Sequence, residues 1–243
     1  MRVEDLRVSV YADGADIGEM KKEYERGIVK GFTTNPTLMK KAGVADYRSF
    51  ARQAVEAFPD LPISFEVFSD EFDTMAKEAR VLSAMGPNVF VKIPVTNTRR
   101  ESSAGLIRRL SSEGMKLNIT AVFTLSQTEA VLDALCPGTE NIISLFAGRI
   151  TNAGVDAEPI MKEASRMAHE KPGTKTLWAS SRELFNIIQA DRTGTDIITV
   201  TFDLLSQITT LGKDLEEYSL DTVKMFYEDG KALGFHILEE EKP

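Results

Sequence analysis

Residues 87–96 read Pro-Asn-Val-Phe-Val-Lys-Ile-Pro-Val-Thr, the most apolar strand-like run of the chain, and a lysine interrupts it. Such a lysine is either buried in apolar surroundings or extends at the strand end so that its ammonium reaches water. Burial lowers the pKa of a lysine because the charged form loses hydration, and a neutral amine forms Schiff bases with carbonyl compounds. The run predicts a strand and leaves both interpretations of Lys92 open.

Short apolar runs alternate with segments of helical period through most of the sequence. The expected strands cover residues 7–12, 27–33, 63–68, 88–95, 116–122, 141–146, 176–180 and 196–200. The expected helices include residues 15–26, 72–85, 102–112, 126–135, 157–170 and 182–190. Eight strand–helix units predict the α/β class and a single (β/α)8 TIM barrel over residues 1–243. A doubly wound open sheet is the alternative, but no Gly-x-Gly-x-x-Gly motif follows the first strand.

Two further helices are expected after the eighth strand, near residues 202–211 and 219–235. The second has four apolar side chains on one side: Leu220, Val223, Phe226 and Tyr227. Because an apolar helix face needs a partner surface, we expect an extra C-terminal helix that packs on the barrel or on a neighbouring subunit.

The composition, with 42% hydrophobic and 27% charged residues, is that of an ordinary globular protein that can bury a substantial core. The net charge of -8 argues against nucleic acid as the main partner, because phosphate backbones are bound by clustered lysine and arginine. Residues 1–13 contain no apolar stretch long enough for a signal peptide, and no segment approaches the roughly 20 apolar residues of a membrane helix. We expect a cytoplasmic protein without membrane or nucleic-acid partners.

The cysteine and the histidines do not form a metal-binding pattern. Cys136 is the single cysteine, so the sequence has no disulfide framework and no Cys-x-x-Cys motif. His169 and His236 lie far apart and form no His-x-His or His-Glu-x-x-His pair. A metal-dependent aldolase or hydrolase is therefore not expected.

Polar residues recur where the predicted strands end: Asp13, Thr33, Asn35, Glu66, Lys92, Asn118, Thr120, Ser144 and Ser180. Side chains from the carboxyl ends of barrel strands converge on one pocket. Several have an ordinary alternative, such as a helix N-cap for Asp13 or Ser180 and a turn for Thr33 and Asn35. Charged groups inside a barrel, however, are costly unless they are paired or used. An amine with two carboxylates and a bound water is the set that Schiff-base chemistry requires.

Six segments resemble, in order and spacing, the motifs of the transaldolase family: residues 11–17 (YADGADI), 31–38 (GFTTNPTL), 90–94 (FVKIP), 117–124 (LNITAVFT), 144–150 (SLFAGRI) and 179–182 (ASSR). The resemblance implies a (β/α)8 barrel that transfers a dihydroxyacetone unit from a ketose phosphate to an aldose phosphate. The reaction proceeds through a lysine Schiff base without metal or organic cofactor, in the pentose phosphate pathway of carbohydrate metabolism.

The same resemblance assigns roles to individual residues. Lys92 would be the nucleophile and Asp13 would handle the proton of the sugar hydroxyl, while Glu66 and Thr120 would hold the catalytic water. The substrate would be bound by the remaining motif residues: Asn35 and Asn118 at the dihydroxyacetone hydroxyls, Thr33 and Ser144 in the polar wall, and Arg149, Ser180 and Arg182 at the terminal phosphate.

Two positions distinguish transferases from the related fructose-6-phosphate aldolases, which release free dihydroxyacetone. Those lyases tend to have glutamine and tyrosine where this chain has Glu66 and Phe146, which favours transfer. The lyase remains the alternative, followed by a non-catalytic sugar-phosphate-binding barrel. Family members of this length often form homo-oligomers, so a homo-oligomer is expected.

Overall fold

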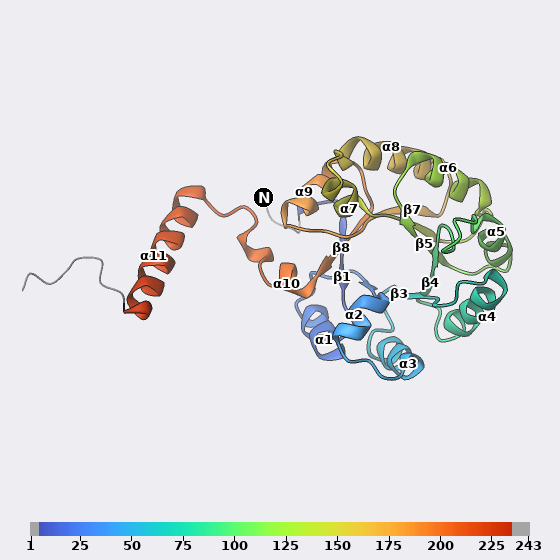
Figure 1. The fold of residues 1–243 in the computed structure, drawn as a ribbon, viewed down its shortest axis with the longest axis horizontal. Helices are drawn as coiled ribbons and strands as arrows, with labels where there is room; N and C mark the ends of the chain where they lie inside the picture. Colours follow the sequence, from blue (N-terminus) through green and yellow to red (C-terminus); the bar gives the residue numbers. More distant parts are fainter. Residues whose placement is uncertain (1–4, 235–243) are drawn as a thin grey trace, which may run out of the picture.

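Eight parallel strands form a closed barrel in the computed structural model, which describes residues 5–234 (Figure 1). Each strand pairs with the next one along the chain, and β1 pairs with β8 to close the sheet. The strands are β1 (Ser9–Asp13), β2 (Phe32–Thr33), β3 (Ile63–Glu66), β4 (Val89–Pro94), β5 (Leu117–Val122), β6 (Asn141–Leu145), β7 (Thr174–Trp178) and β8 (Ile197–Thr201). The predicted (β/α)8 TIM barrel is confirmed.

Helices follow the strands, and all but the last, α11, lie around the barrel (Figure 1). They are α1 (Ile17–Glu25), α2 (Pro36–Lys41), α3 (Tyr47–Ala57), α4 (Phe72–Ser83), α5 (Ala104–Ser112), α6 (Leu125–Ala134), α7 (Ala147–Asn152), α8 (Ala157–His169), α9 (Phe185–Arg192), α10 (Phe202–Leu205), the 3-10 helix η2 (Ile208–Thr210) and α11 (Leu215–Leu233). Side-chain oxygens of Asp16, Asn35, Asp46 and Thr124 accept hydrogen bonds from the first backbone N–H groups of α1, α2, α3 and α6. These caps fix where the helices begin. Since Asp16 caps α1, the N-cap alternative for Asp13 is wrong.

The two faces of strand β4 lie in different environments, one toward the surrounding helices and one inside the barrel. Successive side chains of a strand point to opposite faces of the sheet. Val91 and Ile93 belong to the large core between barrel and helices, whereas Phe90 belongs to a smaller cluster inside the barrel. Lys92 shares the inward face with Phe90.

The barrel interior is apolar below the carboxyl ends of its strands. Five buried side chains from different strands fill it: Tyr11, Phe90, Ile142, Leu177 and Ile197. The polar residues at the carboxyl ends therefore lie above a closed floor, as expected for a barrel whose interior is packed.

Strands β2 and β7 differ from their predicted ranges for reasons that the backbone shows. The strand expected at residues 27–33 starts only at Phe32, because Gly27 has a φ of +72° and its N–H bonds to the Tyr24 carbonyl in the turn after α1. The strand expected at 176–180 runs from Thr174 to Trp178, and Ser180 lies beyond it with a left-handed φ of +65°.

Helix α11 lies apart from the barrel (Figure 1), and none of its residues is buried. It begins at Leu215, four residues before the predicted start, because the Asp214 side chain accepts hydrogen bonds from the first N–H groups of the helix. The predicted last residue, 235, lies outside the described residues. Across residues 5–234, no helix combines the length and the apolar character needed to cross a membrane.

Candidate active site

Lys92 lies inside the barrel, where it is 6% exposed. Its Nζ donates a hydrogen bond to the Thr34 carbonyl oxygen at 2.9 Å and lies 3.1 Å from Oε2 of Glu66. Glu66 and Lys92 are register partners on β3 and β4, so closure of the sheet brings them together. The alternative in which Lys92 reaches water is therefore wrong. Lys92 is buried, as the first interpretation expects, and its neighbours at this height include the polar groups of Thr34 and Glu66, whereas Val91 and Ile93 point outward.

Asp13 ends β1 and shares the same cavity as Lys92. Thr33 Oγ1 donates a hydrogen bond to Oδ1 of Asp13 at 2.8 Å and lies 2.5 Å from Thr199 Oγ1. Burial raises the pKa of the Asp13 carboxyl above its ordinary value of 3.8, although Lys92 and the hydrogen bond from Thr33 act in the opposite direction. A carboxyl with a raised pKa next to an amine is suited to proton transfer.

Asn118 is held by two hydrogen bonds in the polar part of the barrel. Its Nδ2 donates to Ser64 Oγ at 3.0 Å, and its Oδ1 accepts from Ser144 Oγ at 2.6 Å. Asn118 is fully buried and is a register partner of Lys92 on β5. Because both ends of its amide already have partners, Asn118 fixes Ser144, which faces the cavity.

Thr120 lies next to an irregularity of β5. The register between β5 and β6 shifts between Ile119 and Val122, and Ala121 has a left-handed φ of +58°. Bulges of this kind redirect side chains near active sites. The Thr120 hydroxyl is buried without a hydrogen-bond partner among the described residues, and it lines the cavity. A bound water or substrate oxygen would satisfy it.

A cavity of about 390 Å³ opens at the carboxyl ends of the strands. It is lined by eleven of the twelve residues predicted for the site: Asp13, Thr33, Asn35, Glu66, Lys92, Thr120, Ser144, Phe146, Arg149, Ser180 and Arg182. Asn118 is the one that does not reach the cavity wall. The prediction that these residues converge is thus met in space, while their individual roles stay predictions.

One end of the cavity is positively charged. Arg149 lies on α7 with its guanidinium 5.4 Å from the centre of the Phe146 ring, and Arg182 follows β7. Within residues 5–234, neither guanidinium has a carboxylate partner in an ion pair. Arginines without partners at a cavity wall are suited to a phosphate or carboxylate.

The end of the cavity that carries Arg149 and Arg182 depends on close contact between the backbone of α7 and the loop after β7. A Cβ atom built on Gly148 would lie 1.7 Å from the Ser180 carbonyl oxygen. The Gly148 N–H bonds to the Ala179 carbonyl at 3.3 Å, and Ser180 holds its left-handed conformation directly after. Glycine at 148 therefore lets α7 and the loop after β7 pack together.

Three groups that the sequence analysis did not single out complete the site: the Thr199 hydroxyl, the Ser64 hydroxyl and the Thr34 carbonyl. Thr199 and Ser64 interrupt apolar strand runs on inward-facing positions, and that interruption was the available signal. A backbone carbonyl leaves no trace in residue identity. No group of histidine, cysteine, aspartate and glutamate suited to a metal ion occurs within the described part of the chain.

The arrangement supplies a nucleophilic amine, a carboxylate that can take its proton, a second carboxyl for proton transfer and an anion site at the far end. These groups fit covalent chemistry on the carbonyl of a small anionic compound.

Residues 10–237 match the family model described as Transaldolase/Fructose-6-phosphate aldolase. A probable transaldolase of Dehalococcoides mccartyi is 36% identical over 200 residues, which cover 82% of this chain and 89% of that protein. A probable transaldolase of Thermoplasma volcanium is 33% identical over 231 residues, which cover 93% of this chain and all of that protein (100%).

Two solved structures share the fold at low identity. A 2,3-dimethylmalate lyase has a TM-score of 0.56 and 14% identity, with 99% of this chain and 89% of that chain covered. A 3-keto-L-gulonate-6-phosphate decarboxylase from Vibrio cholerae has a TM-score of 0.53 and 10% identity, with 81% of this chain and 88% of that chain covered. These likenesses concern the barrel fold alone.

Substitution of Gly148 by alanine is expected to destabilise the protein by about 1–3 kcal/mol, because the added methyl group meets the Ser180 carbonyl. Gly105→Ala is a matched control, since Gly105 is also the second residue of its helix but has open space around it. That control should stabilise by about 0.5–1 kcal/mol through helix propensity. Urea unfolding measures both, and equal effects would contradict the packing argument.

Proposed function

The chain belongs to the transaldolase/fructose-6-phosphate aldolase family, and we propose that it is a transaldolase that works through a Schiff base on Lys92. It would transfer a dihydroxyacetone unit from a ketose phosphate, of the fructose 6-phosphate or sedoheptulose 7-phosphate type, to an aldose phosphate. The observation that carries the mechanism is a buried amine 3.1 Å from a carboxylate, in a cavity whose two arginines form no ion pair within residues 5–234.

The covalent step starts at Lys92. The Glu66 carboxylate is placed to take a proton from the amine, either directly or through a water that the Thr120 hydroxyl also binds. The amine then attacks the ketose carbonyl to give a carbinolamine, Glu66 returns the proton to the carbinolamine hydroxyl, and that hydroxyl leaves as water to form the protonated imine. The positive charge of this iminium ion draws the electron pair of the carbon–carbon bond that breaks, which the neutral ketone does less well.

Cleavage needs a base at the sugar hydroxyl. Asp13 as carboxylate accepts that proton, the carbon–carbon bond breaks, an aldose phosphate leaves, and the enamine remains on Lys92. Thr33 orients the carboxylate through its hydrogen bond. Asn35 and Ser144 face the dihydroxyacetone part, while Arg149, Ser180 and Arg182 face the phosphate. The enamine then attacks the acceptor aldehyde, and the same groups act in reverse.

We also infer the setting and the assembly. Substrates of this kind support a place in the pentose phosphate pathway, and the enzyme must share the cytoplasm with them because charged sugar phosphates do not cross membranes unaided. Helix α11 supports a homo-oligomer: Leu220, Val223, Phe226 and Tyr227 are 52%, 60%, 65% and 63% exposed on a helix that buries nothing in its own chain. Of the two expected partners, a neighbouring subunit is the one we propose.

The Schiff base is tested by incubation with fructose 6-phosphate, reduction with borohydride and mass spectrometry of peptides. Wild-type protein should gain one reduced dihydroxyacetone on Lys92, and Lys92→Ala should lose both the adduct and turnover. Lys162→Ala is the control, because Lys162 is an exposed lysine on α8. Binding of the sugar phosphate with no adduct would instead favour a non-catalytic barrel.

Transfer is separated from simple cleavage by acceptor dependence. With fructose 6-phosphate alone, we expect one equivalent of glyceraldehyde 3-phosphate per active site and little free dihydroxyacetone. Addition of an aldose phosphate acceptor should restore continuous turnover. Steady release of dihydroxyacetone without any acceptor, measured by enzymatic coupling, would identify a lyase.

Asp13→Asn should retain the adduct and slow cleavage by about 10²–10⁴-fold, because imine formation and bond cleavage make different demands on the site. Because burial raises the pKa of Asp13, wild-type cleavage should fall with decreasing pH at a higher pH than an ordinary aspartate would give. That acid limb should disappear in Asp13→Asn. Single-turnover rates across pH measure it, and an unchanged limb would remove Asp13 from this role.

The assembly role of α11 predicts that Val223→Glu combined with Phe226→Glu lowers the mass of the assembly. Val155→Glu is the control, because Val155 is 49% exposed elsewhere on the surface and should leave the mass unchanged. Light scattering coupled to size exclusion measures both, and an unchanged mass in the α11 variant would contradict the proposal.

A further inference from the structure

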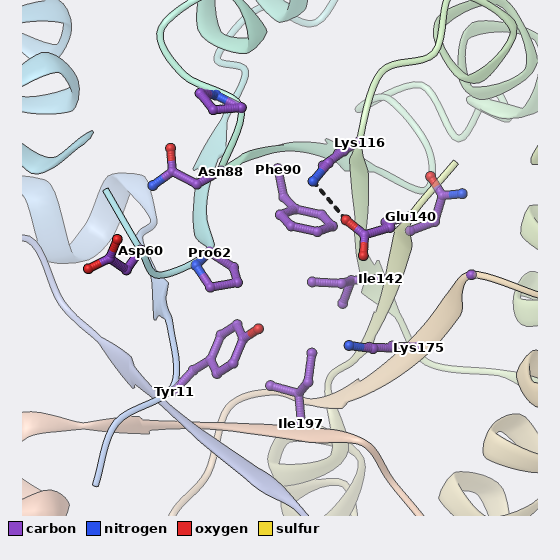
Figure 2. A pocket seen from close by; sticks show the side chains of 13 residues that line it. Tyr11, Asp60, Pro62, Asn88, Phe90, Lys116, Glu140, Ile142, Lys175 and Ile197 are labelled. Atoms are coloured by element: carbon purple, nitrogen blue, oxygen red, sulfur yellow. Dashed lines mark ion pairs between the residues drawn. The ribbon is translucent and has the colours of Figure 1, made fainter. Parts of the chain in front are cut away.

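A second cavity lies at the opposite end of the barrel, where the strands begin (Figure 2). Its volume is about 280 Å³, close to the lower limit of roughly 300 Å³ for small-molecule sites. It shares no lining residue with the cavity around Lys92. The two cavities are separated by the apolar cluster inside the barrel, so this one is a separate candidate site.

Part of the wall of this lower cavity is apolar and buried. Tyr11, Phe90, Ile142 and Ile197 are buried side chains from four strands, and all four line it (Figure 2). The Tyr11 ring lies against the backbone at Gly31, where an added Cβ would come within 2.5 Å of the ring. The cavity therefore has a preformed apolar wall rather than a loose surface.

Two polar groups in this cavity form no hydrogen bond or ion pair within residues 5–234. Tyr11 is 5% exposed, its hydroxyl points into the cavity (Figure 2), and it makes no hydrogen bond to any residue from 5 to 234. Burial and the nearby Glu140 carboxylate raise the pKa of Tyr11 to about 12, so the phenol keeps its proton. An acceptor in the cavity would receive a hydrogen bond from this hydroxyl.

Lys175 is the second such group. Its ammonium points toward the cavity centre (Figure 2) and forms no hydrogen bond or ion pair within the described residues, although its charge helps to lower the pKa of the Glu140 carboxyl. The other lysine, Lys116, is neutralised by Glu140 at 2.7 Å. One ammonium and one phenol without direct partners within residues 5–234 thus face a cavity that both apolar and charged residues line.

We propose that the lower cavity binds a small monocarboxylate with a compact apolar body, whose two oxygens accept from Lys175 and from the Tyr11 hydroxyl. The apolar body would contact Phe90, Ile142 and Ile197. A carboxylate is favoured over a phosphate dianion because a single cation is free, while the Asp60 and Glu140 carboxylates also line the cavity and repel additional negative charge. The site is independent of the proposed transaldolase activity.

Methyl-labelled isoleucine provides a local readout, because Ile142 and Ile197 both line the cavity. Their methyl resonances are assigned through Ile142→Val and Ile197→Val and are followed by NMR during titration with benzoate. Benzamide is the neutral control of the same shape, and inorganic phosphate is the control for a generic anion. We expect saturable shifts of both methyl signals with benzoate, and at least tenfold weaker binding of benzamide and of phosphate.

Variants locate the contact. Lys175→Gln, at an exposed position that does not threaten folding, should weaken benzoate binding at least fivefold, and Tyr11→Phe should do the same by removing one hydroxyl. Arg182→Gln should leave these shifts unchanged, which separates the site from the anion end of the upper cavity. The proposal fails if the isoleucine signals do not respond to benzoate, if Lys175→Gln binds it as tightly as wild type, or if phosphate binds more tightly than benzoate.

Discussion

The ion pair between Lys92 and Glu66 is the interaction on which the rest of this site depends. Two charges taken out of water are costly, and they are tolerated only with good geometry and further hydrogen bonds. The barrel supplies both, because parallel pairing of β3 and β4 sets the two residues side by side and the Thr34 carbonyl accepts a hydrogen bond from the same amine. The same closure aligns Asn118 with Lys92 on β5. The closed sheet thus provides the contacts that offset the desolvation cost of burying this amine.

The two-residue period of the strands explains how much the sequence predicted. Polar residues that interrupt apolar runs, such as Glu66, Lys92 and Thr120, indicated which face of each strand points into the barrel. Because the strands of such a barrel are parallel, their carboxyl ends and these residues lie at the same end of it. The barrel and the convergence of the site followed from this pattern together with the family resemblance. Thr199 interrupts an apolar run in the same way, but a threonine within a strand is common, and its 2.5 Å contact with Thr33 is what marks it as part of the site.

Other features were beyond reach of residue identity. The late start of β2 depends on the positive φ of Gly27, and the shifted end of β7 depends on the left-handed Ser180. The direct contact of Lys92 with the Glu66 carboxylate is likewise not evident from the neighbours of Lys92 along β4. The apolar residues next to Lys92 in the sequence lie along the strand. The Lys92 side chain instead contacts residues of the adjacent strands, and one of these contacts is with a carboxylate.

Phe146 connects the two ends of the upper cavity and bears on the fate of the proposed enamine. Its ring packs at 5.7 Å from that of Phe123 and lies under the Arg149 guanidinium at 5.4 Å, so neighbours on two sides restrain it. A phenylalanine donates no proton, and a hydroxyl at this position would offer one to the enamine carbon or to the water near Glu66. Holding an apolar ring there removes one route to release and favours an intermediate that waits for its acceptor. The balance between transfer and release would then depend on the absence of a proton donor at position 146.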